Sequence, residues 1–169
     1  MDYRIVVSPL GKILLAGDEE GLQLVNFQEG AKPMHPGGDW VQNETAFEQA
    51  AAQLAAYFDG RRQVFDLRLA PEGTPFYRRV WEQLQAIPYG ETITYGELAR
   101  RVGKPNGARA VGLANGRNPL PVVIPCHRVV GADGSLTGYG GGLEIKRALL
   151  ELERRHRDVK AGEQMGMGW

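Results

Sequence analysis

A single cysteine, Cys126, is the feature that most constrains how this chain of 169 residues can fold. With one thiol the chain can form no internal disulfide and no multi-thiolate zinc or iron–sulfur site. The fold must therefore be held by an apolar core, which a chain of this length can bury in one domain or two small ones. Cys126 itself stands between the apolar runs 122–124 and 129–130, so we expect it below the surface.

The residue after the cysteine is His127, one of three histidines. Burial alone raises the pKa of a thiol and makes it inert, whereas an adjacent imidazole can take its proton and leave a thiolate nucleophile. Two interpretations stay open at this point: an inert core cysteine beside a chance histidine, or an activated nucleophile. His35, His127 and His156 have no metal-ligand spacing, so we expect no metal and no cofactor.

The ends and apolar runs of the chain predict its compartment. The first residues form no signal-peptide pattern, and no apolar run approaches the ~20 residues that a membrane span needs. A free thiol fits a reducing compartment. We expect a cytoplasmic protein that does not bind membranes.

The charges are segregated although the net charge is zero. Residues 1–72 carry six Lys/Arg and eleven Asp/Glu, whereas residues 73–169 carry fourteen and nine. Between residues 94 and 128 six basic side chains face Glu97 alone. Such asymmetry suggests a polyanion partner for the second half, although an ordinary solvated face is an equal alternative on charge alone.

The first half predicts a small scaffold of strands and one helix. Strands are expected at 3–7, 12–16, 22–27 and 63–69, with a Gly/Pro-rich loop at 30–39. Thr45 and Glu48 have the spacing of a capping box, which predicts a helix that ends at Gly60. No group of residues in this half assembles a site.

The second half predicts short helices in a basic setting. Thr74 and Pro75 begin one helix, and Thr94 and Glu97 form a second capping box. A turn at 103–107 leads to a further helix at 108–115, closed by Gly116. Two short helices joined by a tight turn resemble a helix-turn-helix, and the basic residues favour DNA over a generic helical hairpin.

The second of these helices is unusual for reading DNA bases. Arg109 is its one long side chain near the start, among Ala108, Ala110 and Gly112. A helix that reads the major groove usually projects several polar side chains at base edges. This helix suits a close approach to a narrow groove with Arg109 alone reaching inward, which implies little sequence specificity.

The remaining segments surround the thiol. We expect a strand-like run at 120–124, a polar turn at 131–135, a flexible Gly-rich loop at 138–142, a helix at 143–155 and a loosely ordered tail at 157–169. The whole pattern predicts an α+β protein of two domains. A small strand-and-helix domain (1–72) precedes a mostly helical domain with a helix-turn-helix (73–169).

Together these segments resemble a known family. The block Ile124-Pro125-Cys126-His127-Arg128-Val129, preceded by Asn118-Pro119 and the helix around Arg109, is similar to the O6-alkylguanine-DNA alkyltransferases. The similarity runs through nearly all of 73–153. It implies direct reversal of DNA damage: a methyl or larger alkyl group moves irreversibly from O6-alkylguanine, and from O4-alkylthymine as an open alternative, to Cys126.

The resemblance also implies roles for the catalytic residues. His127 would be the base for Cys126 through a water, Glu153 would orient the imidazole, and Tyr95 would meet the guanine ring and supply a proton. Taken alone, Glu153 would be interpreted as a solvated helix carboxylate. The pocket would be formed by Asn118, Pro121, Val129, Tyr139 and Gly140.

For DNA the resemblance implies minor-groove binding to a double strand with a flipped base, whose place Arg109 would fill. The expected contacts are Arg109, Ala108, Ala110, Gly112, Arg128 and Thr94. We expect a monomer and leave cooperative binding open. Some members hold a structural zinc through N-terminal cysteines that this chain lacks, and some carry serine where it has Gly140.

Three rival functions remain. A non-catalytic lesion binder of the same fold would lack the cysteine. A Cys-His hydrolase would need an oxyanion hole, and a sequence-specific regulator would need a richer second helix.

Overall fold

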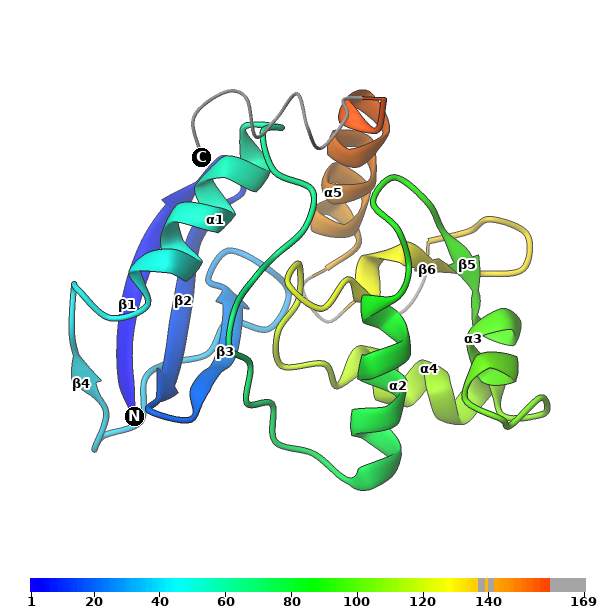
Figure 1. Cartoon of the computed structure of the whole chain (residues 1–169), viewed down its shortest axis with the longest axis horizontal. Coiled ribbons are helices and arrows are strands. Elements are labelled where there is room, and N and C mark those ends of the chain that lie inside the picture. Colours follow the sequence, from blue (N-terminus) through cyan, green and yellow to red (C-terminus); the bar gives the residue numbers. More distant parts are fainter. Residues whose placement is uncertain (137–138, 140–141, 159–169) are drawn as a thin grey trace.

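The computed structural model describes residues 1–136, 139 and 142–158. A sheet with helix α1 on its face is built from the first part of the chain, and helices α2 to α5 follow from the later part (Figure 1). This arrangement confirms the predicted α+β class, with the strands early and the helices late. The tail beyond residue 158 and residues 138, 140 and 141 of the predicted Gly-rich loop lie outside the described residues.

The N-terminal sheet has the strand order β3-β2-β1-β4. Its strands are β1 (Asp2–Ser8), β2 (Gly11–Asp18), β3 (Gly21–Phe27) and β4 (Val41–Gln42). The first three pair antiparallel as predicted, and β4 runs parallel to β1. Ile13 and Leu15 of β2 are fully buried in one cluster with Leu54 and Tyr57 of α1 (Glu48–Phe58), so the helix covers the sheet through these residues.

The capping box predicted at the start of α1 is wrong. The hydroxyl of Thr45 donates to Asn43 Oδ1 instead, at 2.9 Å. The residue that caps the helix is Phe47, which has a left-handed φ of 57° and makes no side-chain capping bond. The chain therefore turns at Asn43 before the helix, and the Thr–Glu spacing coincides with a helix start for a different reason.

The predicted strand at 63–69 is also wrong. Phe65, Leu67 and Leu69 are half-buried and alternate with exposed neighbours, so the pattern correctly identified an extended segment with one face inward. Among the described residues, however, its only ladder contact is an isolated parallel bridge between Leu22 and Leu69. A strand needs a neighbour along its length, and alternation alone does not supply one.

The helices of the second part pack on one another around α2. They are α2 (Pro75–Gln85), α3 (Tyr95–Arg101), α4 (Ala108–Gly116) and α5 (Leu143–His156). The hydroxyl of Thr74 accepts from Tyr77 N at the start of α2, as predicted. The indole of Trp81 donates to Ala114 O at 2.9 Å, which ties α4 to α2 by a buried hydrogen bond.

α3 and α4 form the predicted pair of short helices. Thr94 caps α3 by accepting from Glu97 N at 3.1 Å. The Glu97 carboxylate accepts from Arg100 and Arg101, so the second half of the predicted box is replaced by ion pairs along the helix. α4 continues through Gly116, and its C-cap is Arg117 with φ −93°, so no left-handed glycine ends it.

The strand-like run predicted at 120–124 is a tight turn. Ile124 N donates to Leu120 O at 2.8 Å, and Val122 has a φ of 75°, which is rare for a β-branched residue. Burial of Leu120, Val122 and Ile124 in the core explains the apolar run without a strand. The turn leads into a 3-10 helix, η1 (Cys126–Arg128), and then into β6 (Val129–Val130).

Two features join these segments to the rest of the molecule. β6 pairs parallel with β5 (Ile93–Thr94), which brings the start of α3 beside the residues that follow Cys126. Val25 N on β3 donates to Pro119 O at 2.9 Å, and the buried residues of both parts form one continuous core. Among the described residues no helix has the length and apolar character needed to cross a membrane.

Candidate active site

Cys126 lies inside the molecule at the start of η1, with 4 % of its surface exposed. Burial raises the pKa of the Cys126 thiol to about 11, although a hydrogen bond from the Asn118 side chain and the charge of Lys146 act in the opposite direction. The thiol is therefore protonated at neutral pH. It becomes a nucleophile only when a neighbouring base accepts its proton.

His127 has the protonation state that such a base requires. Its Nε2 lies 2.6 Å from Glu153 Oε2, and both side chains are buried. Burial lowers the pKa of His127 although Glu153 opposes this effect, so the imidazole is neutral. An ionised carboxylate can only accept, which assigns the ring proton to Nε2 and leaves a lone pair on Nδ1. That nitrogen is buried and has no hydrogen-bond partner among the described residues.

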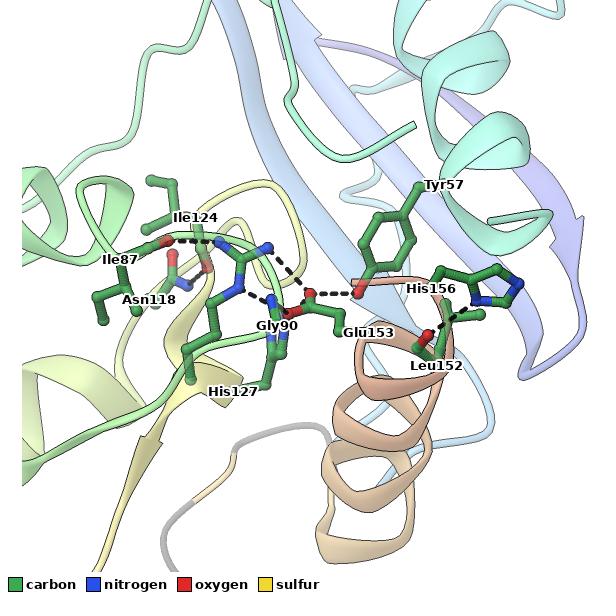
Figure 2. Close-up of polar contacts among 10 residues, drawn as sticks. Tyr57, Ile87, Gly90, Asn118, Ile124, His127, Leu152, Glu153 and His156 are labelled. Carbon is green, nitrogen blue, oxygen red and sulfur yellow. Dashed lines mark hydrogen bonds and ion pairs between the residues drawn. The ribbon is translucent and has the colours of Figure 1, made fainter. Parts of the chain in front are cut away.

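The Glu153 carboxylate is held by donors from three parts of the chain (Figure 2). Oε2 accepts from Tyr57 Oη at 2.7 Å, from His127 Nε2 and from Arg128 Nη2 at 2.9 Å. Oε1 accepts from Arg128 Nε at 2.8 Å and from Gly90 N at 3.1 Å. Burial alone would raise the pKa of Glu153, but His127 and Arg128 hold it well below its usual range. The carboxylate is therefore ionised and fixed in place.

Arg128 was expected to contact DNA, and the structure gives its side chain a different environment. Arg128 as a residue is 6 % exposed. Its guanidinium binds both oxygens of Glu153 and donates from Nη1 to Ile87 O at 2.6 Å. A side chain bound on this many sides inside the core cannot reach a phosphate. We therefore leave Arg128 out of the proposed DNA contacts, because it serves the buried carboxylate.

Four of the predicted site residues line one cavity of about 410 Å³. They are Asn118, Pro121, Cys126 and Tyr139; residues of β3, the loop after it and the end of α4 complete the wall. Asn118 donates to Ile124 O at 2.8 Å and accepts from Leu120 N at 2.9 Å, so it ties the turn ahead of the thiol together. Gly140 was also predicted to line the pocket, and it lies outside the described residues.

Val129 and Tyr95 lie close to the same region. Lys146 Nζ donates to Val129 O at 2.7 Å and stands 6.0 Å from the centroid of the Tyr95 ring. A Cβ atom added to Gly112 would meet the Tyr95 ring at 3.7 Å, which places this ring against α4. Tyr95 is thus positioned between α4 and the residues after the thiol.

The predicted DNA-contacting residues of α4 form its outer face. Ala108, Arg109 and Ala110 are exposed and Gly112 is half-buried, while Val111 and Ala114 pack inward. Thr94 is half-buried, and its hydroxyl already caps α3. The structure therefore separates an outer face that carries one long cation from an inner site that carries the thiol.

Three buried polar residues of the site were missed by sequence reasoning. Tyr57 donates to Glu153, Lys146 donates to Val129 O, and Asn115 Nδ2 donates to Cys126 O at 3.3 Å. Asn115 Oδ1 is buried and unpartnered within the described part of the chain. Tyr57 and Lys146 stand at ordinary helix positions, so only Asn115, a polar residue on the inner face of α4, gave a signal in the sequence.

Within the residues that the structure describes, no group of three or more His, Cys, Asp or Glu side chains is arranged to hold a metal ion. A buried thiol, an imidazole whose Nδ1 has no partner among the described residues and a fixed carboxylate are the groups typical of proteins that use cysteine as a nucleophile.

Comparison with known proteins names the family. Residues 75–155 match the model of the 6-O-methylguanine DNA methyltransferase DNA-binding domain, and residues 1–71 match the ribonuclease-like domain of the same proteins. The chain belongs to the 6-O-methylguanine DNA methyltransferase family. This confirms the resemblance seen in the sequence and makes the chain a DNA-repair methyltransferase that acts on DNA by alkyl transfer.

Individual relatives are similar along nearly the whole chain. A methylated-DNA–protein-cysteine methyltransferase of Methanosarcina acetivorans is 58 % identical over 153 residues, which cover 90 % of this chain and 98 % of the relative. A protein of the same name from Mycolicibacterium paratuberculosis is 53 % identical over 157 residues, which cover 92 % of this chain and 94 % of the relative. The crystal structure of Mycobacterium tuberculosis OGT in complex with DNA superimposes with a TM-score of 0.85 at 49 % identity, covering 92 % and 94 %.

Proposed function

We propose that the chain reverses O6-alkylguanine damage in duplex DNA by moving the alkyl group irreversibly to Cys126, once per molecule. The observation that carries this proposal is the buried thiol next to His127, whose Nδ1 is unpartnered among the described residues while its Nε2 is fixed by Glu153. An activated cysteine requires a base and a group that orients the base, and His127 and Glu153 match these two requirements.

The chemistry balances with the residues of the site. His127 Nδ1 accepts the Cys126 proton through a water, and the sulfur attacks the alkyl carbon as the bond from that carbon to O6 breaks. The electron pair stays on guanine, which the Tyr95 hydroxyl protonates, and Tyr95 regains a proton from the imidazolium. The products are guanine and an S-alkylcysteine. Because a thioether carbon is not readily attacked by water, no second round follows.

The way the base reaches the thiol is also part of the proposal. Cys126 is too deeply buried to reach a base inside a duplex, so the alkylated nucleotide must leave the stack, which costs a few kcal/mol. The outer face of α4, with Ala108, Ala110 and Gly112 around Arg109, suits a minor groove. Arg109 would fill the gap, and Thr94 would contact the backbone. In the pocket, the carbonyls of Cys126 and Val129 would accept from the guanine amine.

Four further points stay proposals. The division at residue 72 into a scaffold domain and an alkyl-acceptor domain is supported by the ranges of the two matching family models. We propose a monomer in the cytoplasm, since a reactive thiol is best kept in a reducing compartment. O4-alkylthymine is a second candidate substrate, and cooperative binding along DNA is left to measurement.

The deciding experiment counts alkyl groups. Protein is incubated with about a tenfold excess of duplex carrying one O6-methylguanine, and repaired guanine is measured against protein. We expect a burst that stops at one equivalent, with the added mass on the peptide that contains Cys126. Cys126→Ala should abolish transfer and keep affinity for the duplex, since α4 does not depend on the thiol. A steady climb past one equivalent would identify a hydrolase-like turnover enzyme instead.

A further inference from the structure

We propose that Tyr57, in the sheet-bearing first part of the chain, is a positioning residue for thiol activation, because its hydroxyl fixes the carboxylate that holds His127. The inference rests on the proposed function of Cys126. It extends the catalytic machinery to α1, a helix that the sequence indicated only as scaffold.

The contact is short, buried and specific. Tyr57 Oη donates to Glu153 Oε2 at 2.7 Å, and the same oxygen accepts from His127 Nε2 at 2.6 Å. Tyr57 is fully buried, and Glu153 is 1 % exposed. Figure 2 shows the ring of Tyr57 reaching from α1 to the carboxylate of Glu153. The hydroxyl is thus two hydrogen bonds from the imidazole of the proposed base, through one shared oxygen.

The hydroxyl can act only as a donor here. Burial, followed by the charge of Glu153, raises the pKa of Tyr57 well above its usual value, so the group stays protonated. A donor on Oε2 draws negative charge toward itself and limits rotation of the carboxylate. Both effects reach His127, because its Nε2 proton is held by the same oxygen.

Several charged or titratable groups face this carboxylate or its partners. They are Tyr57 from α1, Tyr89 from the segment before Gly90, Cys126, His127 and Arg128 from η1, Tyr139, and Lys146 and Arg155 from α5. Arg128 binds both oxygens, so it keeps the carboxylate ionised without Tyr57. Removing the hydroxyl therefore leaves the charge in place and strengthens the pull of Oε2 on His127.

The consequence is a shift in pH dependence. A carboxylate with one donor fewer favours the protonated imidazole, so the pKa of His127 rises toward its ordinary value. The neutral form is the base, so activity is lost at a higher pH as the solution is acidified. A residue with only a packing role would lower stability without moving this acid limb.

Tyr57→Phe is the test variant, and Tyr89→Phe is its matched control. The phenyl ring keeps the contacts of Tyr57 with Phe58, Phe65 and Tyr89, and Oε2 retains two other donors. The ring centroid of Tyr89 lies 6.1 Å from that of Tyr57. The buried hydroxyl of Tyr89 has no hydrogen-bond partner among the described residues. The control thus removes the same atom from the same cluster without removing a bond to Glu153.

The measurement is the rate of Cys126 alkylation by free O6-benzylguanine, followed by mass from about pH 5.5 to about pH 9, with thermal unfolding recorded for each variant. For Tyr57→Phe we expect a plateau rate lower by roughly three- to tenfold, a small part of the ~10²–10⁴-fold that a general base contributes, and an acid limb at higher pH. Tyr89→Phe should match the wild type in both.

A double-variant cycle completes the design. If Tyr57 acts through the carboxylate, Tyr57→Phe should change the rate little once Glu153 is replaced by Gln. Equal rates and equal pH profiles for Tyr57→Phe and Tyr89→Phe would overturn the inference, as would a full effect in the Glu153→Gln background. A wild-type protein that transfers no alkyl group would instead refute the proposed function, so the two failures are distinguishable.

Discussion

At the scale of single residues, Cys126 and His127 rest as a neutral pair. The pKa of the thiol is raised to about 11 by burial, and the pKa of the imidazole is lowered, so neither group is charged near pH 7. Many activated cysteines rest as thiolate and imidazolium. Under the proposed function, the thiolate would form only during transfer, when the substrate is already in the pocket, and burial would protect the sulfur from stray electrophiles until then.

This state predicts how Cys126 responds to a small thiol reagent. The rate of its reaction with iodoacetamide should rise about tenfold per pH unit from about pH 7 to about pH 10, because only the thiolate reacts. Peptide mass spectrometry measures the rate, and Cys126→Ser provides the blank. A rate that levels off near neutral pH would contradict the neutral pair and indicate a preformed ion pair.

Arg109 should separate base extrusion from chemistry. It is exposed at the start of α4, away from the buried thiol. We expect Arg109→Ala to lose at least about tenfold in rate on alkylated duplex, where a flipped base costs a few kcal/mol, and much less on free O6-benzylguanine. Arg147→Ala, which removes an exposed cation on α5 outside the basic cluster of α3 and α4, is the control. Equal losses of rate on both substrates would mean that Arg109 supports the folded structure and not base extrusion.

At the scale of elements, the start of α3 depends on one hydroxyl. Thr94 accepts from Glu97 N, and Tyr95 is the first residue of the helix. Thr94→Ala should reduce the free energy of unfolding by about 1 kcal/mol, and Thr94→Ser should restore most of it, since serine keeps the accepting oxygen. Urea denaturation of the three proteins measures this. An alanine variant as stable as the wild type would mean that the cap contributes nothing.

The same elements show what local sequence could predict. The helix starts at Thr74 and Thr94 were predicted because a cap is a contact between residues three positions apart. Thr45 has the same spacing to Glu48 but caps no helix, because its hydroxyl donates to Asn43 Oδ1 instead. The apolar run 120–124 was expected to be a strand, but Asn118 closes it into a turn, and no local pattern carries that information.

The site divides in the same way. Cys126, His127 and Asn118 lie within ten residues, and the family block identifies them together. Tyr57 could not be predicted, because it meets Glu153 across 96 positions of sequence and looks like any other inward-facing helix residue. Arg128 was assigned to DNA from its charge, and its pairing with Glu153 is visible only in three dimensions.

At the scale of the whole molecule, the segregated charges make a testable statement about DNA. The exposed cations around α3 and α4 are Arg100, Arg101, Lys104, Arg109 and Arg117, now without Arg128. If about four to six phosphates are neutralised, log affinity should fall with log salt at a slope of roughly −4 to −5, with little dependence on sequence. Fluorescence anisotropy on two unrelated duplexes measures both. An affinity that does not change with salt would mean that these exposed cations do not contact DNA.

The hydrogen bonds of the Glu153 carboxylate also have a consequence for folding. Its donors belong to α1, to the segment at Gly90 and to η1, while the carboxylate itself belongs to α5. All four must dock before every donor to this carboxylate is in place. Under the proposed function, a collapsed chain in which one of them is undocked would hold the imidazole less firmly, so full reactivity would report that all four segments have assembled.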